Sequence, residues 1–218
     1  MRRPSRQVCL DQRLLAHGCH TLAGRDPALA ALFARNGTPP LWRRDPGFVT
    51  LVRLVLEQQV SLASAAAAYR RLEERLGAVT PEGFLGLDDS ELLRVGFSRQ
   101  KGRYVRLLAA ALVAGDFDLD AANQLDDVAA MTHLQRLVGV GPWTAGNYLL
   151  FALGRPDVWP TGDRALVVSL GRALGHDVAP TYEAADAIAE GWRPWRSVAA
   201  RLLWHDYLGG LAYDASGF

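Results

Sequence analysis

The stretch LVGVGPWTA at residues 137–145 decides the fold. Its two glycines can both adopt φ > 0, so the chain can turn sharply here and leave backbone N–H groups uncovered. Pro142 suits the first turn of a helix, where its missing N–H costs nothing, and an apolar run with helical spacing follows it. Residues 131–137 read as a preceding helix with Thr132 as its N-cap. The sequence therefore predicts a helix-hairpin-helix unit over about residues 132–153.

A hairpin that leads into a helix N-terminus is suited to binding an anion. Uncovered N–H groups and the helix dipole both favour negative charge at that point. A DNA phosphate fits this description. For the glycines alone, a C-cap that joins two core helices is the preferred interpretation.

Asp163 follows the hairpin closely, in the segment WPTGD at residues 159–163. It is predicted to lie in the first turn of the next helix, where the helix dipole favours its ionised form. A plain capping aspartate is the alternative interpretation of this residue.

Most of the remaining chain also has helical patterning. Capping residues and prolines mark where helices begin, and glycines mark where several end. The expected helices start at Asp26-Pro27, Asp45-Pro46, Ala63, Asp89-Ser90, Ser98, Tyr182 and Trp195. Because no strand-like alternation of useful length is present, the sequence predicts an all-α globular protein.

The composition sets limits on location and partners. The 218 residues carry a net charge of +1, and half are hydrophobic. No apolar run is long enough to span a membrane, and the basic N-terminus lacks the apolar run of a signal peptide. We therefore expect a cytoplasmic protein, associated with the nucleoid if it is bacterial. Of the 24 basic residues 23 are arginine, which suits phosphate contacts but would also follow from codon bias.

Cys9 and Cys19 are the two cysteines, and with His17 and His20 they form a group of potential metal ligands. Their spacing fits no common zinc pattern, so ordinary packing is the preferred interpretation. An iron–sulfur cluster needs four cysteine ligands, so none is expected.

Four stretches in order along the chain carry a resemblance to a known family. The hairpin together with Asp163 resembles the helix-hairpin-helix superfamily of DNA base-excision glycosylases. The other three are similar to its 3-methyladenine DNA glycosylase II branch: LEQQVS at residues 56–61, GFSRQK at 96–101 and EGWRPWRS at 190–197. The similarity extends from about Asp45 to Leu208, about three-quarters of the chain.

The resemblance implies two helical lobes that flank a substrate cleft. Residues 45–155 would form the central lobe with the hairpin, and residues 1–44 and 156–218 the terminal lobe. The residues before the central lobe are too few for the β-rich N-terminal domain of longer members. The resemblance also implies a monomer that acts on double-stranded DNA with damaged bases and has no membrane partner.

The resemblance also implies a chemistry. Asp163 occupies the place of the family's catalytic aspartate, beside a sugar that becomes oxocarbenium-like as the N-glycosidic bond breaks. Bifunctional members carry a lysine two residues after the second hairpin glycine, where this chain has Trp143, and Lys101 is the only lysine. We therefore expect a monofunctional enzyme that hydrolyses the bond, leaves an abasic site and requires no cofactor.

The remaining site residues follow from the resemblance by position. The base pocket comprises Trp143, Trp204, Tyr148 and Arg164, the last replacing an aromatic residue of the family. Contacts to DNA are expected from Gly139, Val140, Gly141 and Thr144, from Gln59 as the side chain that fills the gap of a flipped base, and from Arg99 and Lys101 at phosphates. The backbone carbonyls of Gln135, Leu137 and Val140 would hold a structural Na⁺ or K⁺ ion. A polar helix end for Gln59 and a solvated face for Arg99 and Lys101 are the plain alternatives.

The tryptophans bear on the substrate. A cationic base such as 3-methyladenine or 7-methylguanine, once flipped out of the duplex, gains about 1–2 kcal/mol of cation–π energy against an indole. Trp159, Trp192 and Trp195 are assigned to the core instead. Two other functions stay open: a non-enzymatic helix-hairpin-helix protein that only binds damaged DNA, and a glycosylase for oxidised or deaminated bases.

Overall fold

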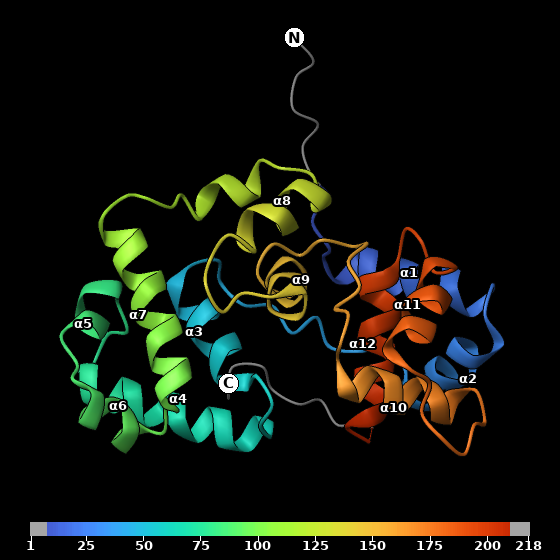
Figure 1. The fold of residues 1–218 in the computed structure, drawn as a ribbon. Coiled ribbons are helices and arrows are strands. Elements are labelled where there is room, and N and C mark those ends of the chain that lie inside the picture. The colour runs from blue at the N-terminus through green and yellow to red at the C-terminus, as the bar shows by residue number, and fades with distance from the viewer. Residues whose placement is uncertain (1–7, 210–218) are drawn as a thin grey trace, which may run out of the picture. The chain divides into compact units, whose positions relative to one another are not determined.

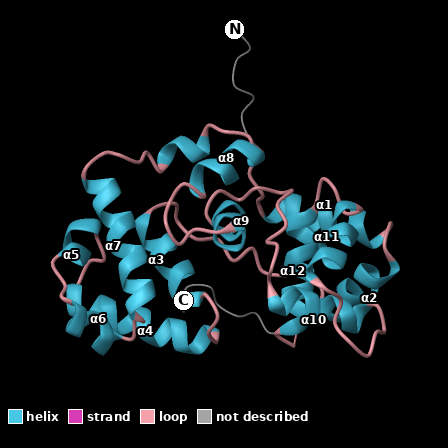
Figure 2. Ribbon diagram, in the orientation of Figure 1, coloured by secondary structure: helices cyan, strands magenta, loops and turns pink. Residues whose placement is uncertain are grey.

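The computed structural model describes residues 8–209, and all regular structure in this range is helical (Figure 1, Figure 2). It comprises twelve α-helices and one short 3-10 helix, with no strand between residues 8 and 209. The predicted all-α class is therefore confirmed. The chain divides into two compact units, and the boundary falls within one helix, between Tyr148 and Leu149. Within the described range, no helix combines the length and apolar character needed to cross a bilayer.

The first unit is a continuous stretch of chain, residues 44–148. Its core lies where α7 packs against α3 and α5. Phe84 is fully buried there and makes edge-on ring contacts with Phe48 and Phe97. The elements of this unit are α3 (Phe48–Glu57), α4 (Leu62–Leu76), α5 (Pro81–Leu85), α6 (Asp89–Val95), α7 (Arg99–Val113), η1 (Asp120–Asn123), α8 (Asp127–Leu134) and most of α9 (Pro142–Phe151).

The second unit combines two separate parts of the described chain, residues 8–43 and 149–209. Its central helix contacts α1, α2, α10 and α11 and is buried on nearly all sides, which explains its lack of a polar face. The elements of this unit are α1 (Gln12–Ala23), α2 (Pro27–Asn36), the end of α9, α10 (Arg164–Ala173), α11 (Tyr182–Glu190) and the central helix α12 (Arg196–Tyr207).

A buried guanidinium lies at the centre of the second unit. Arg201 is 1% exposed, and it donates hydrogen bonds of 3.0, 3.1 and 3.0 Å to the carbonyls of Leu41, Ser197 and Leu150. These acceptors offset part of the cost of removing the charge from water. Burial nevertheless lowers the pKa of Arg201 to about 9. One side chain thus ties three distant stretches of chain together.

Several helices begin where their capping residues predict. Asp26 accepts hydrogen bonds from the first turn of α2, Ser98 caps α7, and α11 begins at Tyr182 as expected. The predicted start at Asp45-Pro46 was wrong, because α3 begins at Phe48. The Asp45 carbonyl instead accepts a hydrogen bond from the Thr50 hydroxyl.

The helix that precedes the hairpin also differs from its prediction. Helix α8 begins at Asp127, and Asp126 is its N-cap, accepting a hydrogen bond from the Ala129 N–H. Thr132 lies in the last turn, and its hydroxyl donates to the Val128 carbonyl at 3.0 Å. The prediction of Thr132 as N-cap was therefore wrong, because the aspartate upstream provides the stronger cap.

Candidate functional site

The hairpin between α8 and α9 requires glycine at one position more than at the other. Gly139 adopts φ = +87°, and a Cβ atom there would lie 2.3 Å from Cγ of Tyr104 on α7. Gly141 has no positive φ, and a Cβ atom there would meet no atom within 4 Å. The expected positive φ is confirmed for Gly139 and wrong for Gly141, because the residue before a proline, here Pro142, favours extended backbone.

The hairpin presents backbone donors at the start of α9. Within residues 8–209, no hydrogen bond uses the N–H groups of Gly139 and Gly141. The Val140 N–H is engaged inside the turn, where it donates to the Leu137 carbonyl at 3.1 Å. The first helical hydrogen bond of α9 joins the Ala145 N–H to the Gly141 carbonyl at 2.9 Å. Two uncovered donors at a helix N-terminus can bind an anion, whereas the Val140 N–H is already used.

A glutamine that the sequence interpretation missed braces the hairpin from α3. The Nε2 atom of Gln58 donates to the Gly139 carbonyl and to the Thr144 hydroxyl, both at 3.0 Å. Thr144 is only 2% exposed, so its side chain braces the hairpin internally, and the DNA contact expected of Thr144 stays a prediction. The double glutamine in LEQQVS was the signal available in the sequence.

The turn between α3 and α4 holds an exposed side chain in an uncommon conformation. Gln59 has φ = +57°, a conformation rare for residues other than glycine, and it is exposed. Lys101 lies close to this turn, but its Nζ atom donates to the Leu56 carbonyl at 2.7 Å. Burial lowers the pKa of Lys101. This bond uses one of the three N–H donors of the ammonium to hold the end of α3, and the expected phosphate contact of Lys101 stays a prediction.

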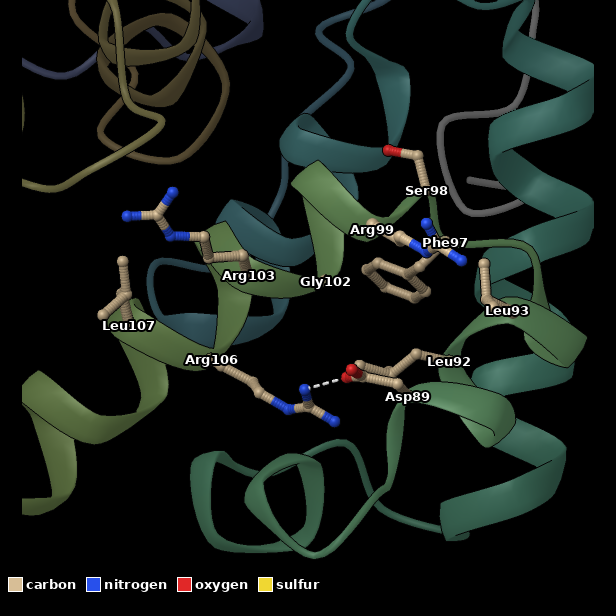
Figure 3. Close-up of a pocket in the computed structure, with 10 residues that line it drawn as sticks. All are labelled: Asp89, Leu92, Leu93, Phe97, Ser98, Arg99, Gly102, Arg103, Arg106 and Leu107. Carbon is tan, nitrogen blue, oxygen red and sulfur yellow. Dashed lines mark hydrogen bonds and ion pairs between the residues drawn. The ribbon is translucent and has the colours of Figure 1, made fainter.

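Arg99 projects from a different face of α7, since residues two apart on a helix point in nearly opposite directions. It lines a surface cavity of about 410 Å³ between α6 and α7, with Arg103 and the apolar Leu93 (Figure 3). Arg106 in the same cavity is paired with Asp89. The exposed guanidinium groups of Arg99 and Arg103 make no ion pair with the described residues, so this face is basic.

In the second unit, two donors fix the carboxylate of Asp163. Asp163 is the N-cap of α10, one residue earlier than the predicted first turn, and its Oδ1 accepts the Leu166 N–H at 3.0 Å. The indole Nε1 of Trp204 donates to the same oxygen at 3.2 Å. Trp204 in turn stacks on Phe151, with ring centroids 5.3 Å apart and planes at 21°. The carboxylate is thus oriented by both a helix start and a buried indole.

The tryptophan-rich motif of residues 190–197 braces the segment that leads to Asp163. The Ser197 hydroxyl accepts the Val158 N–H at 2.9 Å and donates to the Val158 carbonyl at 3.0 Å. Arg196 Nε donates to the Asp157 carboxylate at 3.0 Å. The core assignment of three further tryptophans is confirmed, because Trp159 and Trp192 are buried and Trp195 packs against the same core.

The other predicted pocket residues lie in different environments. Tyr148 is 1% exposed, and its hydroxyl accepts the N–H of Gly47, the N-cap of α3, at 2.9 Å. Burial raises the pKa of Tyr148 to about 12. This environment is that of a core residue that anchors α3. Trp143 lies in the first turn of α9, and Arg164 is exposed in the first turn of α10, directly after Asp163.

The cysteine and histidine group near the N-terminus is spread out in the structure. Cys19 is buried, which raises the pKa of its thiol to about 12, while Cys9 is exposed and accepts a hydrogen bond from Arg43. His17 packs edge-on against the ring of Trp195. Among residues 8–209, no three His, Cys, Asp or Glu side chains are grouped so that they could hold a metal ion.

Comparison with known proteins adds independent information. The chain is 27% identical over 165 residues to DNA-3-methyladenine glycosylase 2 of Escherichia coli, covering 71% of this chain and 55% of that protein. It is 26% identical over 162 residues to the DNA-3-methyladenine glycosylase of Bacillus subtilis, covering 69% and 54%. The chain therefore spans about half of these two proteins, and 64% and 38% of two other relatives.

The fold matches solved structures as well. The DNA-3-methyladenine glycosidase of Bacillus halodurans superposes with a TM-score of 0.72 at 26% identity, over 87% of this chain and 88% of that one. Residues 52–194, which contain the hairpin, Asp163 and part of the tryptophan-rich motif, match the HhH-GPD superfamily of base excision DNA repair proteins. Since this match covers well over half of the 218 residues, the chain belongs to the HhH-GPD superfamily.

Proposed function

We propose that this protein is a monofunctional DNA glycosylase that flips out alkylated bases, such as 3-methyladenine and 7-methylguanine, and hydrolyses their N-glycosidic bonds. Similarity to proteins named DNA-3-methyladenine glycosylases supports the substrate class. One observation carries the proposal: the Asp163 carboxylate is held by the Leu166 N–H and the Trp204 indole at the start of α10. A protein that only bound DNA would not need such a carboxylate.

In the proposed reaction, the bond between the base and the sugar C1′ breaks, and the base leaves with the bonding electrons. A cationic alkylated base leaves as a neutral molecule, so it needs no proton. Positive charge develops on the sugar, and the Asp163 carboxylate stabilises it. A water then adds to C1′ and gives up a proton, which Asp163 accepts. The products are the free base and an abasic site.

The proposal of a monofunctional reaction rests on the lysines. Cleaving the strand through a Schiff base requires an amine near C1′. The family position of that amine is Trp143, and Lys101 is the only lysine of the chain. Its ammonium donates to the Leu56 carbonyl in the first unit. Trapping of a covalent DNA complex by borohydride would contradict this part of the proposal.

Duplex DNA is the proposed partner. The N–H groups of Gly139 and Gly141 would bind a phosphate, and Gln59 would occupy the space left by a flipped base. Its exposure on a turn next to the hairpin supports this role. Arg99 would add a phosphate contact from its basic face. We propose that the protein acts as a monomer.

A monovalent cation at the hairpin is part of the proposal. The carbonyls of Gln135, Leu137 and Val140 would hold Na⁺ or K⁺. The ion would offset the partial negative charge of these carbonyl oxygens near a phosphate. The Leu137 carbonyl accepts one hydrogen bond from Val140, and its second lone pair suits a cation ligand. Backbone carbonyl oxygens can replace the hydration shell of a monovalent cation such as K⁺. No reaction step depends on this ion.

Trp204→Phe should slow base release about tenfold or more. Phenylalanine can keep the stacking on Phe151 but lacks the N–H that holds Asp163, and hydrogen bonds to charged groups contribute about 1.5–3 kcal/mol. The measurement is the single-turnover rate of base release with saturating enzyme. Thermal unfolding of the same variant is the control. A slower rate at an unchanged melting temperature would place the effect at the Asp163 carboxylate, whereas an unchanged rate would contradict the role of the Trp204 indole.

The proposed function is tested by incubating the protein with methylated duplex DNA and measuring free 3-methyladenine and 7-methylguanine. Release of either base, with strand cleavage only after alkali, is expected. Binding to damaged DNA without release would favour a non-enzymatic binding protein. A panel of oligonucleotides with single oxidised, deaminated or alkylated bases tests the remaining alternative, a glycosylase for other lesions.

A further inference from the structure

The last turn of α3 is fixed at two successive residues. The Leu56 carbonyl accepts the ammonium of Lys101 at 2.7 Å. The next residue, Glu57, is paired with Arg44 through two hydrogen bonds of 2.7 and 3.2 Å. Both side chains of this ion pair are buried, with exposures of 6% and 9%. A paired buried charge holds its backbone firmly, because separating the pair would leave either charge uncompensated.

The following residue connects this helix end to the hairpin. Gln58 donates from one nitrogen to the Gly139 carbonyl and to the Thr144 hydroxyl. These acceptors lie on either side of Gly141, whose N–H is one of the two uncovered donors. The exposed Gln59 follows immediately, at φ = +57°. The chain thus places its proposed inserting side chain one residue from a fixed link to its proposed phosphate-binding turn.

We propose that Gln58 is a positioning residue that sets the place of Gln59 relative to the hairpin. With this link, binding of a phosphate at the hairpin and entry of Gln59 into the base stack occur in one preset geometry. Without the Gln58 link, the hairpin still binds the strand, but the position of Gln59 relative to the hairpin is no longer fixed. This inference rests on the proposed function, and it concerns the flipping step and not the bond cleavage at Asp163.

The experiment compares one alkylated base in two contexts, in a fully paired duplex and in an unpaired bulge. Gln58→Met keeps the length of the side chain but removes both donated hydrogen bonds. We expect kcat/KM to fall about tenfold on the paired duplex, from the loss of two neutral hydrogen bonds. On the bulge, where the base is already unstacked, the loss should be less than about threefold, because less work is needed to flip the base. Gln59→Ala should show the same difference between contexts.

Gln124→Met is the matched control, because Gln124 is exposed beside η1 and its side chain forms no hydrogen bond with the described residues. It should behave as wild type in both contexts. If Gln58→Met does not fold, Thr144→Val removes one of the two acceptors and should show the same difference on a smaller scale. Equal losses in the two contexts, or no loss in either, would overturn the role of Gln58. Wild-type protein that releases no base from either substrate would instead contradict the proposed function.

Discussion

Asp163→Asn should abolish base release and leave the fold intact. Asparagine is as good an N-cap as aspartate, and its Oδ1 can still accept the Leu166 N–H and the Trp204 indole. What the variant loses is the negative charge. Removing one group that stabilises developing charge typically slows an enzyme about 10²–10³-fold, and we expect a loss at least that large. The measurement is single-turnover release of 3-methyladenine, together with thermal unfolding.

Asp11→Asn provides the control for the capping role. Asp11 caps α1 in the same way, with its side chain accepting the Leu14 N–H at 2.7 Å. Both variants should unfold within about 0.5 kcal/mol of wild type, since the cap is preserved. Only Asp163→Asn should lose activity. If Asp163→Asn retained more than a tenth of the wild-type rate, Asp163 would not be the catalytic carboxylate.

Gly139→Ala should strongly destabilise the first unit and weaken DNA binding. The added Cβ atom would meet the ring of Tyr104 at 2.3 Å, and φ = +87° is unfavourable for alanine. Backbone strain of this kind and overpacking cost about 1–3 kcal/mol each, so a loss of about 2–6 kcal/mol is expected. Thermal unfolding measures the stability. Fluorescence anisotropy with an abasic duplex measures the binding.

Gly141→Ala separates the two glycines of the hairpin. Its φ is not positive and the space around it is open, so its melting temperature should stay close to that of wild type. Combining Gly139→Ala with Tyr104→Ala should recover part of the lost stability, because the clash is relieved and the strain in φ remains. Equal melting temperatures for the two single glycine variants would refute this account of the turn.

The fold class and the hairpin could be predicted from the sequence because both depend on local signals. Glycine, proline and capping residues act within a few positions of where they stand, so the start of α9 at Pro142 could be predicted, and Asp163 was placed within one residue of its position at the start of α10. The start of α8 was missed because Asp126, the cap in the structure, lies six residues before Thr132, the cap that was predicted.

Contacts between distant residues were not predictable in the same way. Gln58 bonds the Gly139 carbonyl across 81 positions in the chain, and Trp204 bonds Asp163 across 41. Nothing in the spacing of these residues specifies such pairs. Lys101 shows the same limit, since nothing in its place in the sequence indicated its bond to the Leu56 carbonyl at the end of α3.

The discontinuous second unit has a consequence for synthesis on the ribosome. Residues 44–148 form a contiguous body that can become compact as soon as it emerges. Helices α1 and α2 are made before this body, yet they pack on α12, and Arg201 joins the carbonyls of Leu41 and Leu150 only after it has left the exit tunnel. These two helices are thus made well before they can be buried, and a nascent chain halted before residue 201 would expose their apolar faces to chaperones.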